Sequence, residues 1–73
     1  MSDTFRKGQQ VIWDWGGGTA TGTIRDRYVR KVTRRIKGSA ITRNGDVDNP
    51  AYLIVQEDGD EVLKLASELR PAR

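Results

Sequence analysis

The side chains that proteins use most often for catalysis and metal binding are missing from this sequence. Its 73 residues include neither His nor Cys, which excludes disulfides, thiolate nucleophiles, imidazole bases and the zinc sites built from these residues. A general base would have to be Asp, Glu, Lys or Tyr, and none of these stands in a recognisable pairing with Ser or Thr. We therefore expect a protein that is not an enzyme, has no metal site and uses no cofactor.

Two short motifs invite a ligand-binding interpretation that their surroundings do not support. Gly16–Gly18 is followed by no helix and no Lys-Ser/Thr pair, so it predicts a flexible loop at the mouth of a groove rather than a phosphate cradle. Residues 57–61 carry four carboxylates around Gly59 but lack the ligand spacing of a calcium loop. We interpret that segment as a turn that also favours solubility.

Aromatic side chains are the first candidates for a binding site. Rings can hold a cation against their faces, where the π quadrupole compensates for lost hydration. The alternative is that the rings form the hydrophobic core, which is the more common role of buried aromatic residues and which so small a chain needs. The candidates for an aromatic groove are Trp13, Trp15, Tyr28 and Tyr52, with Asp14 as the acidic residue near its mouth.

Charge is divided unevenly along a chain whose net charge is only +3. Residues 25–43 contain eight basic residues and one acid, a net of +7, and residues 46–68 contain seven acids and one base, a net of −6. The basic segment could neutralise the phosphates of nucleic acid, with Tyr28 stacking on a base. Internal pairing of opposite charges is the commoner outcome, and head-to-tail self-association is a third. The basic residues are Arg25, Arg27, Arg30, Lys31, Arg34, Arg35, Lys37 and Arg43.

Glycines and apolar alternation divide the first fifty residues into short strands. Val11, Trp13 and Trp15 share one face of a first strand. Residues 19–32 predict a second strand, in which Gly22 marks a bulge or a bend. The pattern of residues 33–50 determines no single conformation, but turn signals at 43–46 and 48–50 predict an irregular segment between them. Within them, residues 36–42 are either a strand interrupted by a glycine or a charged loop.

The remaining residues predict a hairpin and a final turn. Residues 51–57 and 61–65 form two strands joined by a two-residue turn at Asp58-Gly59. Residues 67–70 fit a single helical or 3₁₀ turn, which Ser67 can cap and Pro71 ends.

Both faces of the strand that begins at Ala51 are apolar. Tyr52 and Ile54 lie on one face, and Leu53 and Val55 lie on the other, a pattern typical of a strand covered on both sides. Either residues 33–50 or a second subunit covers the second face, unless one Leu and one Val stay partly exposed. The chain is therefore expected to be a monomer or a weak homodimer.

Several spaced motifs resemble the hypervirulence-associated Tudor-like family over residues 5–70. They are WDWGGGTA at 13–20, IKG at 36–38, TRNG at 42–45 and DNPAYLI at 48–54. The resemblance implies an all-β fold, a small five-stranded barrel of Tudor or Src-homology-3 type with a short C-terminal 3₁₀ or helical turn. The family is largely bacterial with some fungal members and has no assigned molecular activity. Tudor domains that read methylated side chains carry an aromatic pair after the first loop, where this chain has Thr19-Ala20-Thr21.

These observations favour a non-catalytic binding module with one domain over residues 5–71 and a flexible N-terminus at residues 1–4. A protein or peptide is the expected partner, bound in a groove near the Gly16–Gly18 loop. Nucleic-acid binding through the basic segment 25–43 and self-association are the alternatives. No apolar run is long enough to span a membrane, so we expect no membrane contact and a cytoplasmic location.

Overall fold

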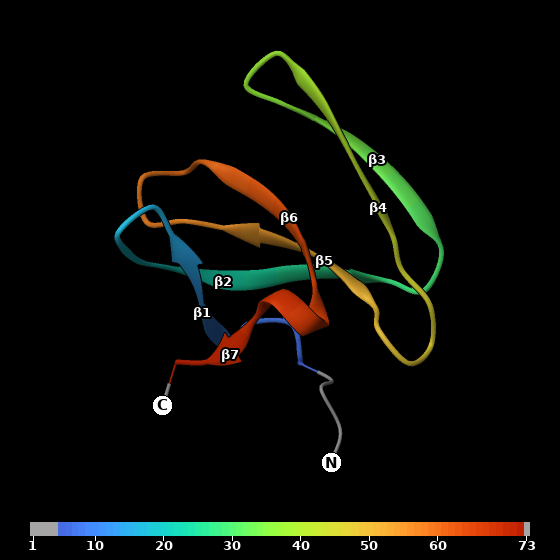
Figure 1. The fold of residues 1–73 in the computed structure, drawn as a ribbon, viewed down its shortest axis with the longest axis horizontal. Coiled ribbons are helices and arrows are strands. Elements are labelled where there is room, and N and C mark those ends of the chain that lie inside the picture. The colour runs from blue at the N-terminus through green and yellow to red at the C-terminus, as the bar shows by residue number, and fades with distance from the viewer. Residues whose placement is uncertain (1–4, 73) are drawn as a thin grey trace.

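The computed structural model describes residues 5–72 (Figure 1). The flexible N-terminus expected at residues 1–4 lies outside the described residues. The described chain forms seven strands and one 3₁₀ turn. These are β1 (Gln10–Trp15), β2 (Gly18–Tyr28), β3 (Lys31–Ile36), β4 (Ser39–Asn44), β5 (Ala51–Val55), β6 (Glu61–Leu65), η1 (Ala66–Glu68) and β7 (Arg70–Pro71). Within these residues, no helix is long and apolar enough to cross a membrane.

The strands form two antiparallel sheets, so the expected closed five-stranded barrel is wrong, although the all-β class and the final 3₁₀ turn are right. Five strands lie in the order β6-β5-β2-β1-β7, and β3 pairs only with β4. The sheet stays open at β6 and β7 because neither strand has a hydrogen-bonded neighbour on its outer side. In Figure 1 the β3–β4 hairpin lies outside this sheet, beside β5 and β6.

Strand β2 joins the two halves of the larger sheet. Its first part pairs with β1 and its second part pairs with β5, with a register shift between Ile24 and Asp26. The bulge therefore falls at Arg25, and Gly22 has a different role: a Cβ at Gly22 would overlap the Ile54 side chain. The strand ends at Tyr28, and a turn separates it from β3, which divides the single strand expected over 19–32.

Residues 31–44 form a regular hairpin, which answers the alternative left open for residues 36–42 in favour of strands interrupted at Gly38. Its strands pair from Lys31 with Asn44 to Ile36 with Ser39. The turn at Lys37 and Gly38 has positive φ at both residues, 51° and 81°, which is the backbone of a tight hairpin turn. The turn signal that follows is confirmed. Asp46 Oδ1 accepts hydrogen bonds from the backbone N–H groups of Asp48 at 2.9 Å and Asn49 at 2.7 Å.

Two hydrophobic clusters occupy the two faces of β5. The first contains Tyr52 and Ile54, and the Tyr52 hydroxyl accepts a hydrogen bond from the Phe5 backbone N–H at 2.9 Å. The second contains Leu53, and the β3–β4 hairpin covers it with side chains that include Val32 and Ile41. The interpretation that the 33–50 region covers the second face is thus confirmed. The first cluster comprises Phe5, Val11, Trp13, Ile24, Tyr52, Ile54, Ala66 and Leu69, and the second comprises Val32, Ala51, Leu53 and Leu63.

The last two connections differ in detail from expectation. Strand β5 ends at Val55, and the loop to β6 is longer than two residues, with the Gln56 backbone N–H donating to the Asp60 carbonyl at 2.7 Å. The 3₁₀ turn is present, but Ser67 does not cap it. Instead, the Asn49 side chain accepts a hydrogen bond from the Ser67 backbone N–H at 2.9 Å, which ties the turn to the loop before β5.

Candidate functional site

A cleft of about 370 Å³ lies where the ends of three hairpins meet. The β1–β2 turn, the tip of the β3–β4 hairpin and the β5–β6 loop each contribute side chains to it. One part of its lining is apolar and the rest is charged or polar. The apolar residues are Trp13, Trp15, Ala20, Ile36 and Val62, and the others are Lys37, Gln56, Asp58, Asp60, Glu61 and Lys64.

Trp15 is the most exposed large apolar side chain in this cleft. It follows Val11 and Trp13 on the same face of β1, but these two are 0% and 3% exposed whereas Trp15 is 72% exposed. The reason is that β1 continues past the core and ends at Trp15, whose partner across the hairpin is Gly18. Gly16 and Gly17 form a tight turn, with φ 56° at Gly16, so the expected triple-glycine loop is a two-residue turn. The indole is thus presented at the cleft without a side chain opposite to cover it.

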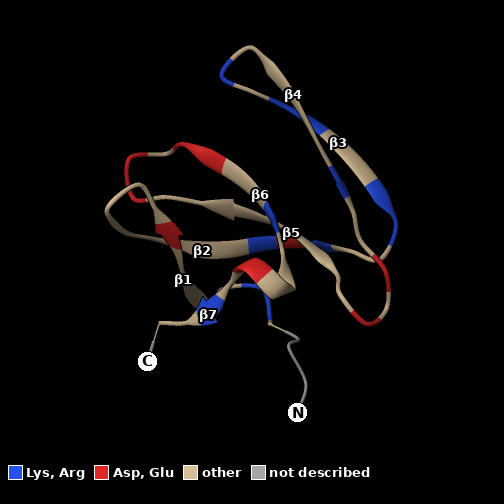
Figure 2. Cartoon of the chain, in the orientation of Figure 1, with Lys and Arg blue, Asp and Glu red and all other residues tan. Residues whose placement is uncertain are grey.

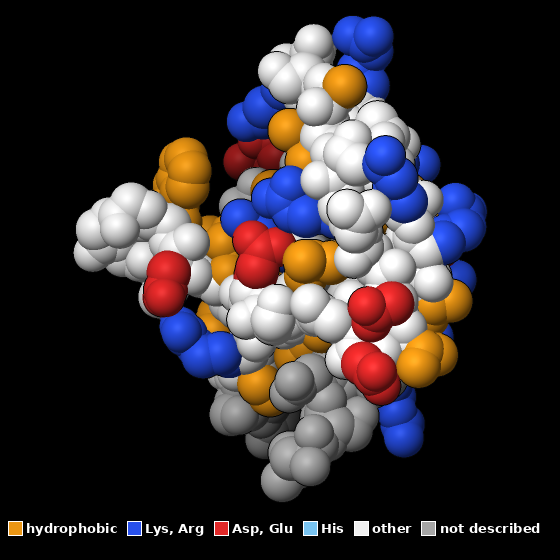
Figure 3. Space-filling view, turned by 45° about the vertical axis from the view of Figure 1, so that its right-hand side comes forward, with side chains coloured by type: hydrophobic (Ala, Val, Ile, Leu, Met, Phe, Trp, Pro, Cys, Tyr) orange, Lys and Arg blue, Asp and Glu red, His pale blue; other side chains and the backbone are white. Residues whose placement is uncertain are grey.

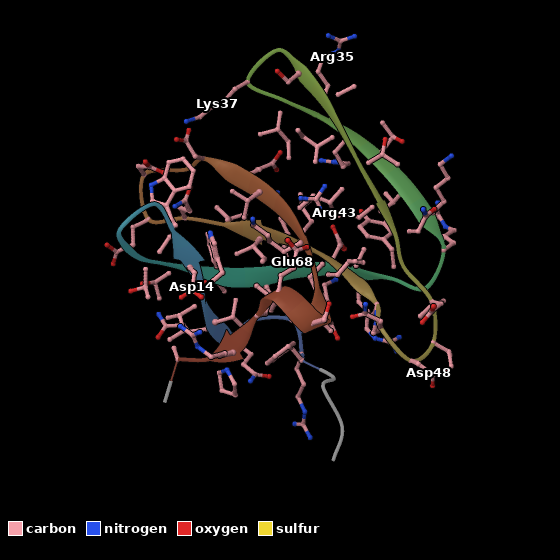
Figure 4. The ribbon with its side chains drawn as sticks, viewed as in Figure 1. Asp14, Arg35, Lys37, Arg43, Asp48 and Glu68 are labelled. Carbon is pink, nitrogen blue, oxygen red and sulfur yellow. The ribbon has the colours of Figure 1, made fainter. Side chains whose placement is uncertain are left out.

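An ion pair joins the hairpin tip to the β5–β6 loop beside this cleft. Lys37 Nζ lies 2.7 Å from Asp60 Oδ2, and Figure 4 shows Lys37 pointing from the hairpin tip toward that loop. The hydrogen bond to Asp60 and the charge of Asp60, with a smaller contribution from the charge of Asp58, raise the pKa of Lys37 above its usual value. The side of the cleft that carries Asp58 and Asp60 therefore also carries the cation of Lys37.

Three further ion pairs connect basic residues of segment 25–43 to acidic residues of β6 and η1 (Figure 2). Glu61 carboxylate oxygens lie 3.6 Å from Arg25 and 3.8 Å from Arg34. Arg43 Nε donates to Glu68 Oε1 at 3.2 Å, and Figure 4 shows these two side chains facing each other. With Lys37, half of the eight basic residues of segment 25–43 are paired internally. Part of the charge segregation along the sequence is therefore an intramolecular complementarity.

The structure does not bring the predicted aromatic residues together. Trp13 is buried and reaches the cleft only at its wall, and Tyr52 is 0% exposed within the first cluster. Tyr28 is half-buried beside the second cluster, on the opposite face of the sheet, where the Arg30 guanidinium carbon lies 5.4 Å from its ring centroid. Asp14 pairs with Arg70 at 3.2 Å. The four rings therefore form no common cage.

Sequence reasoning missed most of the cleft, because only Trp13 and Trp15 among its lining residues were candidates for the groove. Ile36 and Lys37 belong to the hairpin, whose conformation the sequence pattern left open, and Asp58 and Asp60 belong to the segment interpreted as a turn. A signal was present: β-branched residues at positions 32, 33, 36, 41 and 42 flank a Lys37-Gly38 dipeptide. That signal is weak because Lys is not a usual residue at positive φ.

An open antiparallel sheet with a hairpin packed on it, and with a cleft between strand ends, defines a small all-β domain. The part of the chain that the structure describes holds no cluster of acidic side chains that could bind a metal ion. Residues 8–69 match the family described as the Tudor domain of hypervirulence-associated proteins, and the chain belongs to this family. The resemblance found in the sequence is thereby confirmed. No curated protein and no solved structure matches the chain. Tudor-like domains are in general binding modules without catalytic activity.

Proposed function

We propose that this domain is a non-catalytic binding module that takes a short segment of a partner protein into the cleft beside Trp15. The observation that carries the proposal is the exposure of this indole, 72%, in a chain whose other tryptophan is 3% exposed. A large apolar side chain at the surface is informative because folding gains nothing from leaving it there. Tryptophan is also enriched among the residues that dominate binding energy in protein interfaces.

The cleft has the size and the mixed lining of a recognition site. A volume of about 370 Å³ lies within the range of ligand pockets and is enough for one or two side chains. Ile36 and Val62 extend the apolar surface from Trp15, while Asp58 and Asp60 supply carboxylates at the other side. We expect a peptide that places an apolar side chain against Trp15 and a Lys or Arg toward the carboxylates.

The residues of the cleft support binding rather than turnover. Its lining contains no Ser, Cys, His or Tyr that could act as an activated nucleophile or a general base near neutral pH. Two of its three carboxylates are paired with cations, Lys37 on Asp60 and Arg34 on Glu61, and Asp58 forms no ion pair within residues 5–72.

A display library of random ten-residue peptides tests this proposal. Selected peptides are titrated into the domain while tryptophan emission is recorded, and burial of the exposed Trp15 indole should shift the emission to the blue. Trp15→Ala should weaken binding by about 30-fold, which corresponds to about 2 kcal/mol for a central interface residue. Val47→Ala is the matched control because Val47 is also 72% exposed and does not line the cleft.

Two results would count against the proposal. One is a library that yields no peptide whose binding changes tryptophan emission. The other is a set of selected peptides that bind the Trp15→Ala variant as tightly as the wild type, which would place their site elsewhere. The Asp60→Asn variant distinguishes the contribution of the acidic part of the cleft from that of the apolar part. We expect it to weaken the binding of peptides that carry Lys or Arg and to leave the binding of uncharged peptides unchanged.

A further inference from the structure

The β3–β4 hairpin has one face that packs on the sheet and one that does not. The face of β3 that packs on the sheet carries every second residue of the strand: Val32 and Ile36 contact the second cluster, and Arg34 faces Glu61 of β6. Because side chains of a strand alternate between faces, the intervening residues of β3 point away from the sheet. Antiparallel register places three residues of β4 beside them. The outer face therefore consists of Lys31, Thr33, Arg35, Ala40, Thr42 and Asn44.

The basic side chains of this outer face are among those that internal pairing leaves over. Lys31 and Arg35 form no ion pair within residues 5–72, nor does Arg30 in the turn that precedes β3. Figure 4 shows Arg35 pointing outward at the hairpin tip. In Figure 3, Lys and Arg side chains are spread over the upper and right-hand parts of the molecule. No acidic residue belongs to the outer face itself.

We infer that the outer face of the β3–β4 hairpin binds double-stranded DNA, with the two-stranded ribbon lying in the major groove. Two-stranded ribbons are one of the elements that the major groove, about 12 Å wide, admits. Lys31 and Arg35 are four residues apart on one strand, a span of about 13 Å at about 3.3 Å per residue. They can therefore reach phosphates on the two sides of the groove. At the base of the hairpin, the exposed Arg30, whose guanidinium carbon lies 5.4 Å from the Tyr28 ring centroid, adds a third cation.

The centre of the outer face has the chemistry that the groove floor requires. Thr33 Oγ1 and Thr42 Oγ1 lie 2.8 Å apart across the two strands, so this pair of hydroxyls is fixed in place by the register. Threonine can hydrogen-bond to base edges and can contact the methyl group of thymine, and asparagine, present here as Asn44, can pair with adenine. Short uncharged side chains between flanking cations allow the backbone of the ribbon to approach the bases.

The acidic residues of the domain limit where a polyanion can lie. Asp46 and Asp48 occupy the loop that follows β4, and Figure 4 shows Asp48 at the end of the molecule away from Arg35. The carboxylates of β6 and its loop lie against the inner face of the hairpin, paired with its cations. Contact is therefore confined to the outer face, and the number of phosphates engaged is small.

Salt dependence of DNA binding provides the test. Fluorescence anisotropy is measured with a labelled 20-base-pair DNA duplex of mixed sequence at 40 and 120 mM salt. Three phosphate contacts give a slope of about −2.7 in log K against log salt, so affinity should fall about 20-fold between these concentrations. Lys31→Gln/Arg35→Gln leaves one contact, and its affinity should fall only about 3-fold over the same interval. At 40 mM this double variant should bind more weakly than the wild type.

Matched controls separate this surface from net charge and from the cleft. Arg6→Gln/Lys7→Gln removes the same two charges outside the hairpin and should retain the wild-type salt dependence. Trp15→Ala should bind DNA as the wild type does, so that DNA binding and peptide binding can fail independently. An RNA duplex of the same sequence should bind more weakly because the A-form major groove is too deep and narrow for side chains. Circular dichroism confirms that each variant is folded.

Several outcomes would overturn the inference. One is the absence of DNA binding by the wild type at 40 mM salt. A second is an equal loss of affinity for the DNA duplex in the two double variants. A third is binding to single-stranded DNA or to duplex RNA that is as tight as binding to duplex DNA. Binding of the wild type to phosphatidylserine vesicles but not to DNA would assign the same cations to an anionic lipid surface and would equally refute it.

Discussion

A methyl group added at Gly22 should destabilise this domain more than a methyl group at any exposed glycine. An ideal Cβ at this position would overlap the Ile54 side chain, and it would lie 3.1 Å from the Val55 carbonyl oxygen and 3.2 Å from the Trp13 ring. Ile54 and Trp13 are both in the first cluster, at 0% and 3% exposure. The neighbours therefore have little room to move, because a packed core resists added volume.

The expected cost of Gly22→Ala follows from measured cases of overpacking. Inserting a methyl group into a packed core costs typically about 1–3 kcal/mol. For a domain of this size each kcal/mol lowers Tm by about 4–8 °C, so the variant should melt some 5–20 °C below the wild type. Gly17→Ala is the matched control, since a Cβ at Gly17 meets nothing within 4 Å. Gly17 is also absent from the positive-φ glycines.

Urea unfolding at one temperature measures both variants, with a second substitution to locate the cause. Ile54→Leu moves the branch point away from the backbone at nearly constant volume and costs less than about 1.5 kcal/mol alone. Combined with Gly22→Ala, it should recover part of the loss, because residues in contact are not additive. Equal midpoints for Gly22→Ala and Gly17→Ala would refute the argument that β2 and β5 need this glycine for their close approach.

Three other predictions concern single contacts. Tyr52→Phe should lower the free energy of unfolding by about 1–3 kcal/mol in urea titrations, because it leaves the Phe5 backbone N–H without its acceptor. The raised pKa of Lys37 means that its ion pair stabilises the fold fully below the unfolded pKa of about 10.4 and ceases to do so as pH rises through the folded pKa. NMR titration of the Lys37 side chain should show a lower pKa in Asp60→Asn than in the wild type, and identical values would contradict the assignment. Sedimentation equilibrium should give a monomer at about 100 µM, because the hairpin already covers the second face of β5. A dimer would show that another apolar surface of the domain binds a second copy.

The parts of the fold that followed from the sequence are those with a strong period of two or a distinctive apolar run. The alternation from Val11 to Trp15 located β1, and the continuous run from Ala51 to Val55 located a strand covered on both faces. The family motifs gave the all-β class. Closure into a barrel did not follow, because local pattern does not determine which strands pair at the edges of a sheet.

The cleft was harder to predict because its residues depend on where each strand ends. Alternation places Trp15 on the same face as Trp13, and nothing in the local pattern indicates that the core stops between them. Lys37 occupies a left-handed backbone position, φ 51°, for which glycine or asparagine is the usual signal. Without that turn the hairpin was not recognised, and the ion pair of Lys37 with Asp60 could not be inferred.

Charge along the sequence and charge on the surface differ in this domain because of strand alternation. Arg34 and Arg35 are neighbours in the chain, yet Arg34 faces Glu61 and Arg35 points outward. A slip of one residue in the β3 register would exchange their faces and would also move Ile36 out of the second cluster. The same register that buries Ile36 therefore decides which cations are neutralised and which remain for a partner. Any substitution that weakens the packing of Ile36 should thus change both the cleft wall and the outer face of the hairpin, whereas Arg35→Gln should change the outer face alone.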